Sequence, residues 1–144
     1  MRLGSLIEEL GVEVGGNTGL DTSVTGFAID NRKVAPGAIF GAFQGLRVNG
    51  EDFIADAVKA GAVAIVARPE AKVEGAVHIA DVNPRRLFAQ LAARYFAPFP
   101  DVTVAVTGTN GKTSTVELAR QLWRMLGHKS ASIGTLGVTT SVDQ

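Results

Sequence analysis

The sequence contains no cysteine, no surplus of either charge and no long hydrophobic run. The absence of cysteine among its 144 residues excludes a disulfide framework and a zinc site built on Cys. Fourteen Lys and Arg residues balance fourteen Asp and Glu residues, whereas nucleic-acid binders owe much of their affinity to a surplus of Lys and Arg. We therefore expect no nucleic-acid partner.

The sequence pattern also predicts no membrane-spanning helix and no signal peptide. The longest apolar runs, such as residues 62–67, have the length of a strand and fall far below the roughly 20 residues that a membrane-spanning helix needs. Residues 1–11 have the spacing of a short amphipathic helix that contains Glu8 and Glu9, which differs from a signal peptide. We expect a cytoplasmic monomer with no membrane partner.

The first part of the chain alternates between strand-like and helix-like segments. Apolar spacing predicts helices in residues 1–11, ended by Gly11, and in residues 53–61. Strands are predicted at residues 24–29, 38–43, 62–67 and 77–80. This alternation is typical of an α/β fold, and we expect residues 1–82 to form a small α/β substrate-binding domain.

The second part begins with a helix start at Asn83-Pro84, because Asn can cap free amides and Pro suits the first helical position. It continues with a predicted strand at 102–106, a glycine-rich loop, a helix at 112–126 and a strand at 130–134. Two parallel strands with one crossover cannot bury both faces of a sheet. We therefore place a boundary near Val82 and expect residues 83–144 to be the incomplete start of an ATP-binding domain.

The segment from Thr107 to Ser114 lies between the predicted strand and helix and has the composition of a phosphate-binding loop. Glycines let successive backbone N–H groups face one anion, and the helix N-terminus adds its dipole. Lys112 is placed to act catalytically by reaching the β- and γ-phosphates of ATP, and the Thr113 hydroxyl to ligate Mg²⁺. The candidate ATP-binding residues are Gly108, Thr109, Asn110, Gly111, Lys112, Thr113 and Ser114.

This loop is shorter than the usual Gly-x-x-x-x-Gly-Lys pattern, since position 106 is Val, and it resembles the loop of the Mur ligases and of folylpolyglutamate synthetase. A second group of residues resembles the front-domain pattern of Mur ligases that act late in peptidoglycan precursor synthesis. It comprises Asp30-Asn31-Arg32, Val34, Pro36-Gly37, Ile39-Phe40, Ala42, Gly45, Asn49-Gly50, Phe53-Ile54, Ala57 and Gly61-Ala62.

Thr109-Asn110 and residues 133–137 are more similar to the ligases that add the third amino acid than to the sibling ligase that adds D-Ala-D-Ala. The resemblance implies an ATP- and Mg²⁺-dependent ligase that joins diaminopimelate or lysine to UDP-N-acetylmuramoyl-L-alanyl-D-glutamate through an acyl phosphate. It also implies that the UDP-sugar is bound by Ile29, Asn31, Leu46, Arg47 and Val48. Asn31 replaces the family's usual Ser.

Three alternatives remain open at this point. The 144 residues alone could form a nucleotide-sugar-binding segment without ligase activity, because the resemblance implies further catalytic groups that have no counterpart here. A different phosphate-loop ATPase would lack the front-domain pattern. Asp30 and Arg32 could be catalytic, although their short spacing near a turn favours a structural ion pair.

Overall fold

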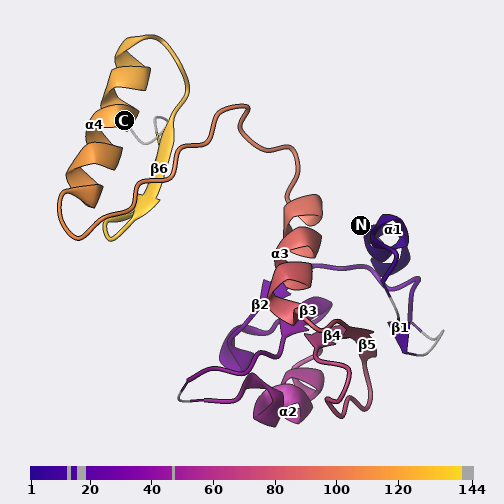
Figure 1. Ribbon diagram of the computed structural model, residues 1–144. Coiled ribbons are helices and arrows are strands. Elements are labelled where there is room, and N and C mark those ends of the chain that lie inside the picture. The colour runs from indigo at the N-terminus through magenta and orange to yellow at the C-terminus, as the bar shows by residue number, and fades with distance from the viewer. Residues whose placement is uncertain (13, 16–18, 47, 141–144) are drawn as a thin grey trace. The chain divides into compact units, whose positions relative to one another are not determined.

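The computed structural model describes residues 1–12, 14–15, 19–46 and 48–140. The chain divides into two compact units, Met1–Phe99 and Pro100–Gln144, and each is described by itself (Figure 1). None of the helices in these described residues has the length and hydropathy that a bilayer span requires.

The first unit is built on a five-stranded sheet in the order β1-β5-β4-β3-β2. The strands are β1 (Val14–Gly15), β2 (Gly26–Ala28), β3 (Ala38–Gly41), β4 (Ala64–Ala67) and β5 (Val77–Ala80). Strands β2 to β5 run parallel to one another, and β1 pairs antiparallel with β5. A mainly parallel sheet connected through helices confirms the α/β fold class that the sequence predicts.

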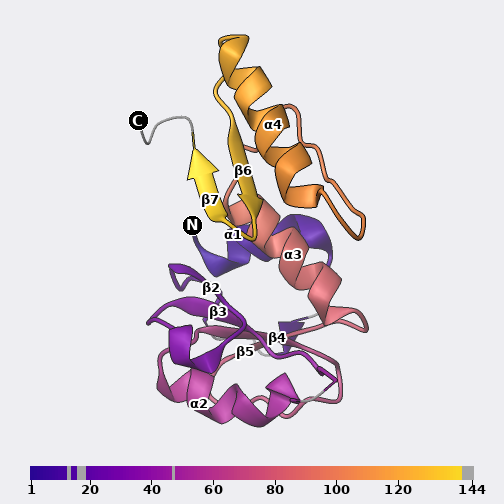
Figure 2. The same cartoon turned by 90° about the vertical axis from the view of Figure 1, so that its left-hand side faces the viewer.

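Helices cover both faces of this sheet, as Figure 2 shows. On one face lie α1 (Leu3–Ile7), which continues into the 3₁₀ turn η1 (Glu8–Leu10), and α3 (Pro84–Tyr95). On the other lies α2 (Ile54–Lys59), preceded by η3 (Gly50–Phe53), while η2 (Asn31–Lys33) follows β2. Gly11 ends the first helical segment in the left-handed conformation, with φ of 59°, as the sequence predicts.

The central strands are buried on both faces. In β4, Ala64 and Val66 face the α1 and α3 layer, whereas Ile65 and Ala67 face the α2 layer, and all four are fully buried. This alternation follows from the two-residue period of a strand. It explains why the β4 sequence is uniformly apolar, as strands of parallel sheets are when helices cover both faces.

Helix α3 belongs to the first unit, so the structure differs from the sequence-based boundary near Val82. Leu87 and Leu91 are buried in the same core as Leu3, Leu6 and Ile79. The helix therefore completes the covering of one sheet face, and the division falls after Phe99 instead. The sequence pattern identifies α3 as a helix but does not show which core its apolar side enters.

The second unit contains α4 (Lys112–Met125) and an antiparallel pair, β6 (Ala131–Gly134) and β7 (Gly137–Thr140). The predicted helix and the predicted strand at 130–134 are present to within one residue. The predicted strand at 102–106 does not form: residues 102–106 have no strand partner in the described part of the chain.

Most apolar side chains of the second unit are exposed. Among its described residues, 100–140, no apolar side chain is buried and Arg120 is the only buried residue. The large exposed apolar residues are Val102, Val104, Leu118, Leu122, Met125, Leu126, Ile133, Leu136 and Val138. This unit therefore gains little free energy from hydrophobic burial, and a lone two-stranded pair is marginally stable in water.

Candidate functional site

The residues predicted to bind a UDP-sugar follow two neighbouring strands. Ile29 and Asn31 come directly after β2, and the 44–49 loop, which contains Leu46 and Val48, comes after β3. Because β2 and β3 are parallel and paired, both segments leave the sheet at the same edge. Ligands of open α/β sheets bind outside this carboxyl edge of the strands, so the fold brings the two predicted segments to a suitable place.

The side chains at this edge are accessible. Ile29 is 68% exposed, and Leu46 and Val48 are also largely exposed. Asn31 is half-buried in η2, where its backbone carbonyl accepts a hydrogen bond from the Val34 amide. Arg47 lies outside the described residues, so its predicted role stays a prediction.

The 44–49 loop has a close-packed base. The Gly45 amide donates to the Val48 carbonyl at 2.9 Å, and the Gly50 amide donates to the Phe43 carbonyl at 2.7 Å. A Cβ atom on Gly50 would lie only 2.6 Å from the Phe43 backbone nitrogen, which explains why this position requires glycine. The two ends of the loop are thus held together by backbone contacts.

Asp30 and Arg32 form a structural ion pair. The Arg32 guanidinium donates to both carboxylate oxygens of Asp30, at 2.9 and 2.7 Å, and the Arg32 amide donates to Asp30 Oδ1 at 3.1 Å. These hydrogen bonds, with the side-chain ones contributing most, lower the pKa of Asp30 to about 2. The pair caps η2 and positions Asn31, which is the structural role that its spacing favours.

The predicted phosphate loop is exposed and begins α4 where the sequence places it. Gly108 and Gly111 have φ of 144° and 75°, conformations that side-chain-bearing residues rarely adopt. Gly111 is the N-cap of α4 and supplies no side-chain cap. This arrangement fits an anionic ligand such as a phosphate, because the free amides of a helix start are the groups that bind one.

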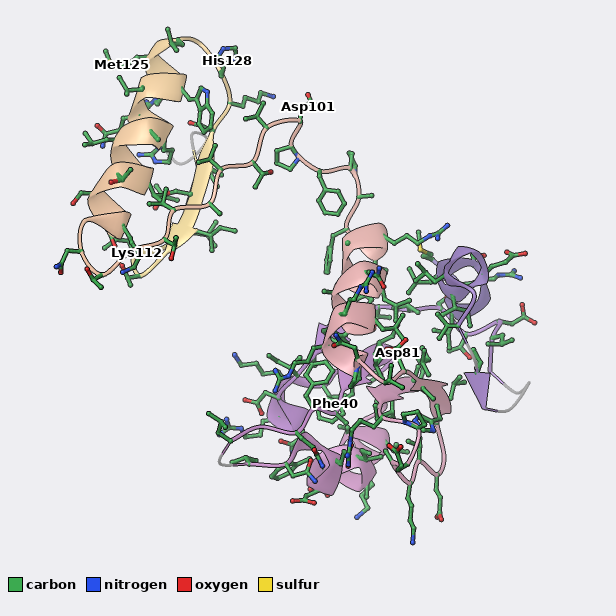
Figure 3. All side chains as sticks on the ribbon, viewed as in Figure 1. Phe40, Asp81, Asp101, Lys112, Met125 and His128 are labelled. Atoms are coloured by element: carbon green, nitrogen blue, oxygen red, sulfur yellow. The ribbon has the colours of Figure 1, made fainter. Side chains whose placement is uncertain are left out.

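The Lys112 ammonium folds back over this loop. It donates to the Gly108 carbonyl at 2.5 Å and to the Thr109 carbonyl at 3.4 Å. Its hydrogen-bond partners are thus exposed backbone oxygens of the loop itself, and its predicted contact with a phosphate stays a prediction. Figure 3 shows Lys112 at the start of α4.

Thr113, the predicted Mg²⁺ ligand, contacts Thr135 across the unit. Their hydroxyl oxygens are 3.0 Å apart, which ties the start of α4 to the turn between β6 and β7. The described residues contain no group of three or more His, Cys, Asp or Glu side chains placed to hold a metal ion. The role of Thr113 as a Mg²⁺ ligand therefore stays a prediction.

Several contacts at these sites were not predicted from the sequence. Arg68 and Glu51 form a bidentate ion pair at 2.8 and 2.9 Å beside the 44–49 loop, and the Arg68 hydrogen bonds lower the pKa of Glu51. Arg85 donates to the Gln44 carbonyl, 41 residues away in the chain. Such pairs have no local sequence signal, because their partners meet only after the sheet has formed.

Comparison with known families supports one assignment. Residues 23–96, which run from before β2 through α3 and include the 44–49 loop, match the model described as Mur ligase family, catalytic domain. The chain belongs to the Mur ligase family.

Individual Mur ligases extend this match to most of the chain. Two relatives are named UDP-N-acetylmuramoyl-L-alanyl-D-glutamate--2,6-diaminopimelate ligase. The one from Zymomonas mobilis subsp. mobilis is 68% identical over 121 residues, or 84% of this chain and 25% of the relative. The one from Bradyrhizobium diazoefficiens is 50% identical over 117 residues, or 81% of this chain and 24% of the relative.

A solved structure of a protein with the same name superposes with a TM-score of 0.78 at 26% identity, covering 98% of this chain and 29% of that one. The chain thus spans about a quarter of the length of the curated Mur ligases that it matches. The family resemblance drawn from the two motif groups is confirmed by these matches.

Proposed function

We propose that this chain supplies the UDP-sugar-binding part and the phosphate loop of a Mur ligase that adds diaminopimelate to UDP-N-acetylmuramoyl-L-alanyl-D-glutamate. The observation that carries the proposal is the position of Ile29, Asn31 and the 44–49 loop at one sheet edge, within the segment that matches the family model. The names of the similar ligases support diaminopimelate as the added amino acid. The protein acts as a monomer in the cytoplasm, where ATP is available.

The chemistry divides between the two units. When bound with Mg²⁺, ATP would supply the γ-phosphoryl group that turns the D-glutamyl carboxylate into an acyl phosphate, which the amine of diaminopimelate then attacks with release of phosphate. Lys112 and the amides of residues 108–114 offset the negative charge on the transferring phosphoryl group. Thr113 contributes its hydroxyl to the metal, and the first unit holds the substrate by its uridine diphosphate end.

Arg47→Ala should weaken binding of UDP-N-acetylmuramoyl-L-alanyl-D-glutamate by about 1–3 kcal/mol if the guanidinium bonds a phosphate of the UDP group. Isothermal titration calorimetry on the 144-residue chain measures this directly. Arg2→Ala is the matched control, because Arg2 bridges to Ser23 before β2 begins and therefore lies toward the opposite edge of the sheet. Equal affinity of wild type and Arg47→Ala would remove Arg47 from the site.

A second function is favoured by one observation for the 144 residues taken alone. Residues 108–114 of the phosphate loop are all exposed in the second unit, whereas phosphoryl transfer takes place in an enclosed, water-poor cleft. The chain by itself would then act as a nucleotide-sugar-binding segment without catalysis.

We expect that the chain alone makes no tripeptide product from ATP, Mg²⁺, UDP-N-acetylmuramoyl-L-alanyl-D-glutamate and diaminopimelate. Mass spectrometry of the reaction mixture checks this, with the full-length Zymomonas mobilis relative as the positive control. Product formed by the chain would show that the 144 residues already contain every essential catalytic group.

A further inference from the structure

Helix α3 reaches the 44–49 loop through one side chain. Arg85 Nη2 donates to the Gln44 carbonyl at 2.8 Å. Gln44 forms an isolated bridge with Asn49, and the Gly45 to Val48 hydrogen bond closes the turn just beyond it. Arg85 therefore contacts the backbone at the base of the loop.

The same guanidinium also contacts the aromatic residue that precedes the loop. Its central carbon lies 5.1 Å from the centre of the Phe43 ring, within the range of a cation–π interaction. Phe43 in turn packs edge-to-face on Phe88 at 5.4 Å. Because Arg85 and Phe88 are three residues apart on α3, they lie on neighbouring parts of one helix surface, and together they hold Phe43 and Gln44.

Close packing restricts the positions that the base of the 44–49 loop can adopt. A Cβ atom on Gly41 would lie 2.5 Å from Phe43 Cζ and 3.0 Å from Phe88 Cδ2. On the other side of the loop, Asn49 Oδ1 accepts from the Glu51 amide, and Glu51 is fixed by Arg68. One end of the loop thus contacts η3, which Arg68 holds from just beyond β4, and the other end is anchored to α3 through Arg85.

We propose that Arg85 is a positioning residue for the UDP-sugar: by holding the backbone at Gln44, it places Leu46 and Val48 at the sheet edge where the ligand binds. This inference rests on the proposed function of that loop. A loop that is ordered before binding loses less conformational entropy when the ligand arrives, so affinity depends on the anchor even though the anchor does not contact the ligand. Arg85 was not among the residues that the sequence pattern predicted to bind substrate.

The test compares Arg85→Met with Arg85→Lys and with the control Arg86→Met in the 144-residue chain. Arg85→Met keeps much of the side-chain length but loses the charge and the hydrogen bond, and Arg86→Met removes the same charge one residue further along α3. Calorimetry with UDP-N-acetylmuramoyl-L-alanyl-D-glutamate should show affinity about tenfold weaker for Arg85→Met, from the loss of one charged hydrogen bond and one cation–π contact. We expect Arg85→Lys, which keeps the positive charge on a shorter side chain, to recover part of this loss and Arg86→Met to stay within about twofold of wild type.

Amide hydrogen exchange in the absence of ligand separates positioning from direct binding. In Arg85→Met the Gly45 amide should exchange about tenfold faster while core amides such as that of Ile65 do not change. Weaker binding with unchanged Gly45 exchange would overturn the proposal and indicate that Arg85 contacts the ligand directly. Unchanged binding together with unchanged exchange would show that Arg85 has no role in UDP-sugar binding. If the wild-type chain binds no UDP-sugar, the proposed function fails, whereas the effect on Gly45 exchange still decides whether Arg85 holds the loop.

Discussion

Lys112→Ala should lower ligation at least about 100-fold in a chimeric ligase in which this chain replaces the matching segment of the Zymomonas mobilis relative. The expected loss follows from the removal of a positive charge that would stabilise the transferring phosphoryl group, an interaction that is stronger in the transition state than in the ground state. The rate of tripeptide formation at saturating substrate measures it. In the 144-residue chain the same change should leave the circular dichroism spectrum unaltered, because Lys112 donates only to exposed loop carbonyls.

The matched control for this prediction is Lys129→Ala. Lys129 is an exposed lysine of the same unit that follows α4, so its removal changes the net charge equally and should leave the ligation rate within about twofold, as surface substitutions usually do. ATP titrations add a second measurement. The chain alone should bind ATP only weakly, since its loop is exposed, and tight Lys112-dependent binding would show that the chain already builds an adequate nucleotide site.

Leu91→Ala should destabilise the first unit by about 2–5 kcal/mol, the usual cost of removing a buried leucine side chain. Leu91 is fully buried between α3 and the sheet. Hydrogen exchange of core amides in β3 and β4 measures the effect on the first unit alone. A loss of stability in the first unit would also show that α3 packs with residues 1–82 rather than with the phosphate-loop unit.

The control for the leucine prediction is Leu118→Ala on α4. Leu118 is 60% exposed, so the same truncation removes little buried area. The free energy of opening measured by hydrogen exchange should then change by less than about 1 kcal/mol in either unit. Full protection of the β3 and β4 amides in Leu91→Ala would contradict the packing described for α3.

The sequence predicts most elements of the first unit because their patterns are local. A few consecutive residues are enough to explain the uniformly apolar strand β4 and the start of α3 at Asn83-Pro84. Gly11 likewise ends a helical segment with a positive φ. The start of α4 directly after Gly111 also lies where the sequence places it, whereas the phosphate-binding role of residues 108–114 stays a prediction.

Features that depend on distant partners could not be predicted in this way. Residues 102–106 have the composition of a buried strand but lack a neighbouring strand in the described part of the chain, and backbone hydrogen bonding requires one. The packing of α3 in the first unit and the contact of Arg85 with Gln44 also depend on tertiary structure. The predicted ligand contacts of Ile29, Asn31, Leu46, Arg47 and Val48 remain predictions that binding experiments must test.

The division into two units gives each of them its own optical reporter. The sequence contains one tyrosine and one tryptophan. Tyr95 lies in α3 of the first unit, edge-on to Phe27 and Phe96, whereas Trp123 lies in α4 of the second. Fluorescence excited selectively at the indole would therefore report on the surroundings of α4 in the phosphate-loop unit.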